Sequence, residues 1–157
     1  MGSLNLKVDF SEIKALEKKY KALAAEETGR FLKETVDEIA TLLYDTVKER
    51  TPVGKYTEWD PREGGTLKRS WVKSKVMDKG SYYEVVVENL APYASFVEKG
   101  HRQRPGRYVH QIGKRLKKGF VQGKFFLEKS EMETKDKAKG IIEKRLKALL
   151  EELKDGR

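Results

Sequence analysis

Residues 88–107, ENLAPYASFVEKGHRQRPGR, contain a short apolar segment that ends in Glu-Lys-Gly and is followed directly by clustered arginines. Pro92 suits the first turn of a helix, where its missing N–H has no partner to lose. Gly100 is placed to end that helix. Three apolar side chains share one helical face: Tyr93, Phe96 and Val97. The sequence therefore predicts a short helix over 91–100 that lies on a sheet through this aromatic face.

Small and acidic residues flank that face. Ala94 and Ser95 would let another backbone approach closely. Glu98 is expected to hold either a nearby basic residue or backbone amides at the root of the loop that follows.

The segment before this helix has the pattern of a β-hairpin. Trp71, Val72 and Val76 indicate one strand, DKGS indicates a turn, and YYEVVVENL is rich in β-branched and aromatic residues. Glu84 and Glu88 fall on the same face of the second strand and are expected to face solvent.

The N-terminal part predicts a strand and a long helix. Alternating apolar residues over 4–10 indicate a half-buried strand, after which Ser11 can cap a helix. Apolar spacings of three and four continue to the Thr51-Pro52 boundary, with a possible bend at Gly29. Two prolines and three glycines make 52–66 an irregular loop.

The C-terminal part predicts a long loop and a second helix. Residues 101–124 contain four glycines and one proline, and are interpreted as a long basic loop. A second amphipathic helix follows Phe125, with these apolar positions: Met132, Ala138, Ile141, Ile142, Leu146, Leu149, Leu150 and Leu153. We expect one domain over 1–157 of the α+β class, an antiparallel sheet packed by the two long helices.

The positive charge of the chain is concentrated in one segment. The formal net charge is +9, and residues 99–127 hold nine cations and no acidic residue. The rest of the chain therefore carries 25 basic and 25 acidic residues. This distribution predicts a local basic surface on a balanced body. The candidate contacts to a partner or to DNA are Arg102, Arg104, Arg107, Lys114, Arg115, Lys117 and Lys118.

Composition argues against several classes of site. The chain has no cysteine, which removes disulfides and thiolate metal ligands, and its two histidines, His101 and His110, are too few for a zinc site unless Glu98 joins them. No P-loop or nucleophile motif occurs. The longest apolar runs are far too short to cross a membrane, and no signal-peptide core is present. We expect no cofactor, no metal and no catalysis, in a soluble intracellular product.

The order of these elements resembles the tail-completion family of long-tailed bacteriophages and prophages. In that family Pro-Val precedes a Gly-x-Leu-basic-x-Ser element, a Tyr-Ala-x-x-Val-Glu-x-Gly element follows, and Pro-Phe-Leu or a similar run opens the last helix. The matching positions are Pro52, Val53, Gly65, Leu67, Ser70, Tyr93, Ala94, Val97, Glu98, Gly100, Phe126 and Leu127. Two departures are the added residues before Gly65 and the long basic segment after Gly100.

The resemblance implies a structural protein of the phage neck, located in the virion and made in the host cytoplasm. Relatives form rings, generally hexameric, between the capsid connector and the tail tube or at the tail terminus. Connector and tail-tube proteins are then the expected partners, with possible DNA contact and no membrane.

Two other hypotheses remain open on the sequence. A small nucleic-acid-binding protein would use residues 99–127 directly, because clustered cations release counterions when they meet phosphates. A basic ribonuclease-like toxin would use His101 or His110 as acid or base.

Overall fold

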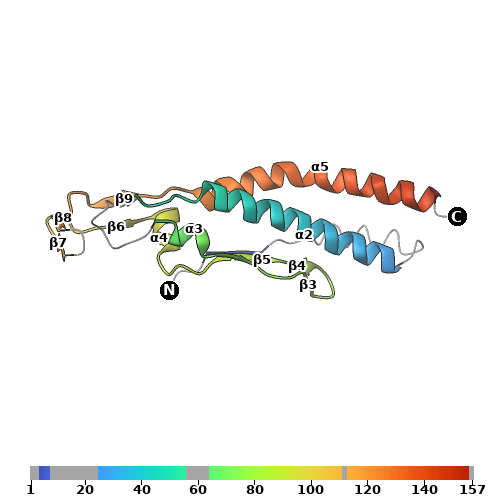
Figure 1. The fold of residues 1–157 in the computed structure, drawn as a ribbon, viewed down its shortest axis with the longest axis horizontal. Helices are drawn as coiled ribbons and strands as arrows, with labels where there is room; N and C mark the ends of the chain where they lie inside the picture. Colours follow the sequence, from blue (N-terminus) through green and yellow to red (C-terminus); the bar gives the residue numbers. More distant parts are fainter. Residues whose placement is uncertain (1–3, 8–24, 56–63, 111–112, 156–157) are drawn as a thin grey trace.

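A computed structural model describes residues 4–7, 25–55, 64–110 and 113–155. The molecule is elongated (Figure 1): two long helices lie side by side, a β-hairpin sheet lies against one of them, and a narrow β-structure projects beyond their end. The expected α+β class is confirmed.

The long helices are α2, Ala25–Arg50, and α5, Phe126–Asp155. They run antiparallel, since Arg50 at the end of α2 pairs with Glu133 near the start of α5, while Arg145 pairs with Glu34 and Glu38. Helix α2 lies between α5 and the sheet (Figure 1). The expected start at Ser11 lies outside the described residues, and the helix continues through Gly29.

The buried face of α2 follows the predicted helical spacing. The apolar side chains of α2 with at most 3% of their surface exposed are Leu32, Val36, Ile39, Ala40, Leu43 and Val47. Because these positions recur every three or four residues, they form one stripe along the helix. Helix α5 covers part of this stripe through Ala138, Ile141 and Ile142, which pack on the cluster around Val36. Met132, expected on this apolar face, is instead 62% exposed.

The main sheet has the strand order β1-β5-β2, all antiparallel. Its strands are β1, Leu4–Lys7, β5, Val86–Asn89, and β2, Trp71–Lys73. The predicted hairpin is confirmed and continues as β3, Met77–Asp78, paired with β4, Tyr83–Glu84. Between the β2–β5 pair and the β3–β4 pair, the Val86 N–H donates to Ser74 Oγ at 2.9 Å. At this point a side-chain hydroxyl takes the place of the backbone carbonyl that would normally accept the hydrogen bond between the strands.

Alternation along β4 and β5 directs one face of the hairpin inward. Tyr83, Val85, Val87 and Asn89 are all buried. Glu84 is also buried, at 8% exposure, so the expectation that it faces solvent is wrong; the sheet is enclosed on both sides at this point. An alternating pattern by itself does not show how much of the outer face the rest of the chain covers.

The aromatic core joins α2, α5 and the hairpin. The Trp71 and Phe126 rings meet edge to face, with centroids 6.2 Å apart and planes at 86°. The Trp71 indole N–H donates to Thr51 Oγ1 at 2.8 Å, which satisfies the one polar atom of a buried ring. A short helix not predicted from the sequence, α3 at Thr66–Arg69, places Leu67 in the same core.

Candidate functional site

The helix predicted over 91–100 is shorter than expected and is rotated about its axis, so that a different face is buried. It is α4, Ala94–Lys99, and its buried residues are Ala94 and Glu98. Tyr93 and Phe96 are 40% and 55% exposed, so the prediction that an aromatic face anchors this helix is wrong. Ala94 and Glu98 are one helical turn apart, and burying both turns the aromatic side chains outward.

Glu98 lies far from α5 in the sequence but caps its N-terminus in the fold. Its Oε2 accepts the Leu127 N–H at 3.0 Å and its Oε1 accepts the Glu128 N–H at 3.1 Å. These donors have no acceptor within the helix, and the positive end of the helix dipole favours a carboxylate there. Of the two partners expected for Glu98, the structure therefore gives the backbone amides.

The chain leaves α4 and returns to it at nearly the same point. The Lys124 N–H donates to Val97 O at 2.9 Å, and the Phe125 N–H donates to Glu98 O at 3.1 Å. Gly100 has φ 82°, and a Cβ there would lie 2.3 Å from Val121 O. A Cβ on Gly123 would lie 2.3 Å from Glu98 O. Two glycines thus allow two backbones to touch at this root.

Residues 100–122, which we call the β-arm, form paired strands and not the predicted long loop. Strand β6, Gly100–Arg102, pairs antiparallel with β9, Phe120–Gln122, and β7, Tyr108–Val109, pairs with β8, Lys114–Arg115. Further backbone hydrogen bonds join the two pairs, from Gln103 N–H to Gly119 O and from Leu116 N–H to Arg107 O. The β-arm is the part that projects beyond the helices in Figure 1.

The predicted cationic residues all lie on the β-arm and all are exposed. Arg102 lies on β6, Arg104 and Arg107 between β6 and β7, and the others on or just after β8: Lys114, Arg115, Lys117 and Lys118. Within the described residues none of them forms an ion pair; the salt bridges there lie within α5, between α2 and α5, or between β2 and α2. Arg115 instead donates to Gly106 O at 2.7 Å and lies over the Tyr108 ring.

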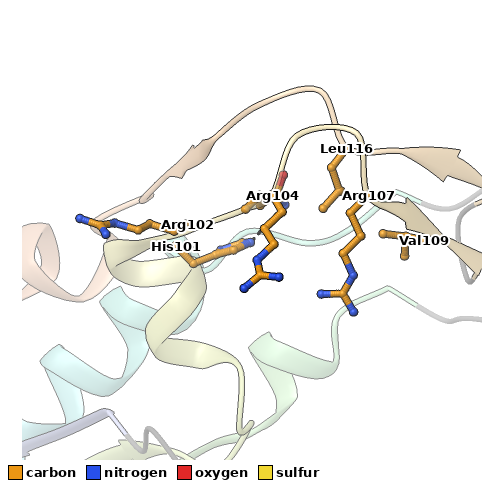
Figure 2. Close-up of a pocket in the computed structure, with 7 residues that line it drawn as sticks. His101, Arg102, Arg104, Arg107, Val109 and Leu116 are labelled. Carbon is orange, nitrogen blue, oxygen red and sulfur yellow. Dashed lines mark hydrogen bonds between the residues drawn. The ribbon is translucent and has the colours of Figure 1, made fainter.

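A hollow of about 810 Å³ lies along one side of the β-arm. Its apolar lining comes from Val109 and Leu116. Figure 2 shows the Arg104 and Arg107 side chains pointing the same way into the space beside the arm, whereas Arg102, which also lines the hollow, extends in another direction. His101 also lines the hollow, and its buried Nδ1 has no hydrogen-bond partner in the described part of the chain.

The two histidines are not brought together into one site. The His101 ring lies against Phe96, with centroids 5.7 Å apart, while His110 lies against Tyr108 at 4.9 Å. Among the described residues, no group of three or more His, Cys, Asp or Glu side chains could hold a metal ion. No helix in the described ranges is both long and apolar enough to cross a membrane.

Asn89 links several of the motif residues, although the sequence analysis gave it no role. Its amide donates to Leu67 O at 2.8 Å, and its Oδ1 accepts the Ala91 N–H at 3.0 Å, so one buried side chain joins α3, β5 and the approach to α4. Gly65, with φ 91°, begins α3, and the Ser70 carbonyl accepts the Leu90 N–H at 2.9 Å. The signal in the sequence that could have identified the role of Asn89 is an amide side chain at the end of an apolar strand.

Comparison with known protein families finds a match that includes this junction. The family model "Bacteriophage HK97-gp10, putative tail-component" matches residues 14–100, more than half of the chain. The chain belongs to the HK97-gp10-like family. The expected relationship to phage tail proteins is thereby confirmed, and the family match ends at Gly100, where the β-arm begins. No curated protein and no solved structure matches the chain.

Proposed function

We propose that this member of the HK97-gp10-like family is a structural component of the phage neck, which forms or joins a ring at the head–tail or tail-terminus interface. The observation that carries the proposal is the family match over 14–100. The junction of α3, β5 and α4 adds support, because the motif residues Leu67, Ala94 and Glu98 are buried there and hold the fold together. The protein would act by docking, without catalysis, and would be located in the virion.

Two features suit assembly contacts. Strand β1 is an outer strand of its sheet in the described part of the chain, and an outer edge offers backbone groups for pairing with another subunit. Leu90, Tyr93 and Phe96 are exposed to 60%, 40% and 55% around α4. We propose that this apolar surface meets a second copy of the chain in the ring, with connector and tail-tube proteins at the two ring faces.

Electron microscopy of particles made without the protein tests the proposed function. We expect heads and tails that fail to join, or tails of irregular length, with normal particles restored by the wild-type chain supplied in trans. Normal particles in its absence would contradict the proposal.

Matched variants in the same complementation assay test the surface around α4. Phe96→Ser should fold but fail to restore particles, because it removes an exposed apolar contact. Met132→Ser is the control, since Met132 is at least as exposed as Phe96, at 62% against 55%, but lies on α5. Equal complementation by both variants would show that the α4 surface is not an assembly contact.

A further inference from the structure

The β-arm carries a positive charge that nothing else in the chain balances. Residues 99–127, which include the β-arm, contribute nine cations and no acidic residue, and seven of the nine lie on the arm itself; the remaining 25 basic and 25 acidic residues of the chain cancel. In the described residues, the arm cations have no carboxylate partner, whereas Arg50, Lys73 and Arg145 in the body do. A second copy of the chain has no net negative charge to offer, so a net anionic partner suits the arm better.

The distribution of these cations favours a polyanion that extends along the arm. They lie along both strands from its root to its far turn, and all are exposed. Several are lysines, which are depleted in protein–protein interfaces but are common phosphate ligands: Lys114, Lys117 and Lys118. A protein partner would instead call for a mostly apolar contact centre with few charges.

The shape of the arm fits double-stranded DNA. A two-stranded β-ribbon can enter the major groove of B-DNA, and the β-arm is such a ribbon, which projects beyond the ends of α2 and α5 (Figure 1). Beside it, Arg104 and Arg107 direct their guanidinium groups into one hollow (Figure 2), where their forked donors can bind a phosphate. Within the described arm, the exposed aromatic rings Tyr108 and Phe120 are too few for a stacking platform on single strands.

We propose that the β-arm binds double-stranded DNA through its phosphates, independently of base sequence. Arg102, Arg104 and Arg107 contact the backbone from one strand of the ribbon, and Lys114, Lys117 and Lys118 from the other. This inference goes beyond the assembly role and does not require ring formation, since each arm carries its own complete set of cations.

The test is fluorescence anisotropy of a labelled duplex of about 25 base pairs and arbitrary sequence, titrated with the full chain at 50 to 200 mM NaCl. We expect binding that weakens steeply with salt and does not change when the sequence is scrambled. Replacing Arg102, Arg104 and Arg107 together by alanine should reduce the slope of log K against log salt by about 2.7, at roughly 0.9 per phosphate contact. Between 50 and 200 mM NaCl the affinity of both proteins falls, and the factor by which it falls should be about 40 times smaller for the variant than for the wild type.

A matched triple variant controls for total charge. Lys33→Ala, Lys144→Ala and Lys147→Ala remove the same charge from exposed helix positions that form no ion pair in the described structure. Its slope should remain close to that of the wild type. A second arm variant, with Lys114, Lys117 and Lys118 all replaced by alanine, should reduce the slope as the arginine variant does. Circular dichroism confirms that each variant is folded.

Three results would overturn the proposal. One is the absence of duplex binding at 50 mM NaCl, and another is an equal loss of salt dependence in the helix control. The third is binding of a polyglutamate peptide of equal charge as tightly as the duplex, which would assign the arm to an acidic protein. None of these results depends on particle assembly, so the proposed function is tested independently by the electron microscopy of particles.

Discussion

The body of the molecule and the β-arm are stabilised in different ways. In the body, buried side chains from α2, α5 and the hairpin form two apolar clusters, and ion pairs join the helices. In the described part of the arm beyond Gly100, not one residue is buried, and the ribbon is held by backbone hydrogen bonds. The body therefore accounts for the stability of the fold, whereas the arm presents charge.

The largest effect is expected from removing an aromatic ring from the body. Phe126→Ala should lower the free energy of unfolding by about 3–5 kcal/mol, because the ring is 1% exposed and packs on Trp71. Phe120→Ala removes the same ring from the arm, where it is 48% exposed, and should cost less than about 1 kcal/mol. Urea unfolding measures both, and similar losses would remove the distinction between body and arm.

The next largest effect is expected where the arm joins the body. Gly100→Ala should cost about 2–4 kcal/mol, since φ is 82° with ψ 175° and the new Cβ would lie 2.3 Å from Val121 O. Gly106→Ala, at φ 83° with open space around it, should cost only about 1 kcal/mol of backbone strain. Thermal unfolding of the pair separates the steric contact from the backbone strain; equal costs would show that the close approach at the root contributes nothing.

A smaller effect is expected at the cap of α5. Glu98→Gln should cost about 1–3 kcal/mol, because the buried carboxylate accepts two backbone N–H groups and an amide can accept only one while directing its NH₂ at the other. Glu128→Gln, exposed in the first turn of the same helix, should cost about 0.3–1 kcal/mol. Equal losses in chemical denaturation would mean that helix-dipole charge alone explains the role of Glu98.

The smallest effect is expected at an exposed ion-pair group of the body. Hydrogen bonds from Lys137 and then Arg50 lower the pKa of Glu133 below its ordinary 4.5. A lowered carboxyl pKa stabilises the fold above the unfolded-state value, and this contribution is lost as pH falls through the folded-state value. Glu133→Gln should therefore be slightly less stable than the wild type at pH 7, and the difference should shrink as the pH falls below the ordinary carboxyl value of 4.5. A difference that grows as the pH falls would contradict this.

Much of the body could be predicted from the sequence, because its signals are long and periodic. The stripe on α2 and the β-branched run of β4 and β5 indicated their elements, and Gly100 was correctly expected to end α4. The Tyr93 and Phe96 rings were placed wrongly because a six-residue helix has too few apolar positions to define its inward face. There the packing of Ala94 and the hydrogen bonds of Glu98 decided the orientation, and both depend on residues far along the chain.

The candidate site was predicted less completely. Its cations are all exposed, as expected for a run without acidic residues, and their role as partner contacts stays a prediction. The paired strands were missed because cations and glycines replace the apolar alternation that normally indicates a strand. A ribbon with no buried residue leaves no such pattern, and its pairing follows from the root, where Gly100 and Gly123 bring two backbones together.

The hydrogen bonds at that root make the arm separable from the fold. Lys124 and Phe125 are already bonded to Val97 and Glu98, so the backbone between them closes a loop whose ends touch whatever its length or content. The whole β-arm can therefore be exchanged, in evolution or by engineering, for a tight turn, a longer ribbon or an affinity tag, while the rest of the protein keeps its architecture. Such a junction lets the arm change without altering the part of the chain that folds.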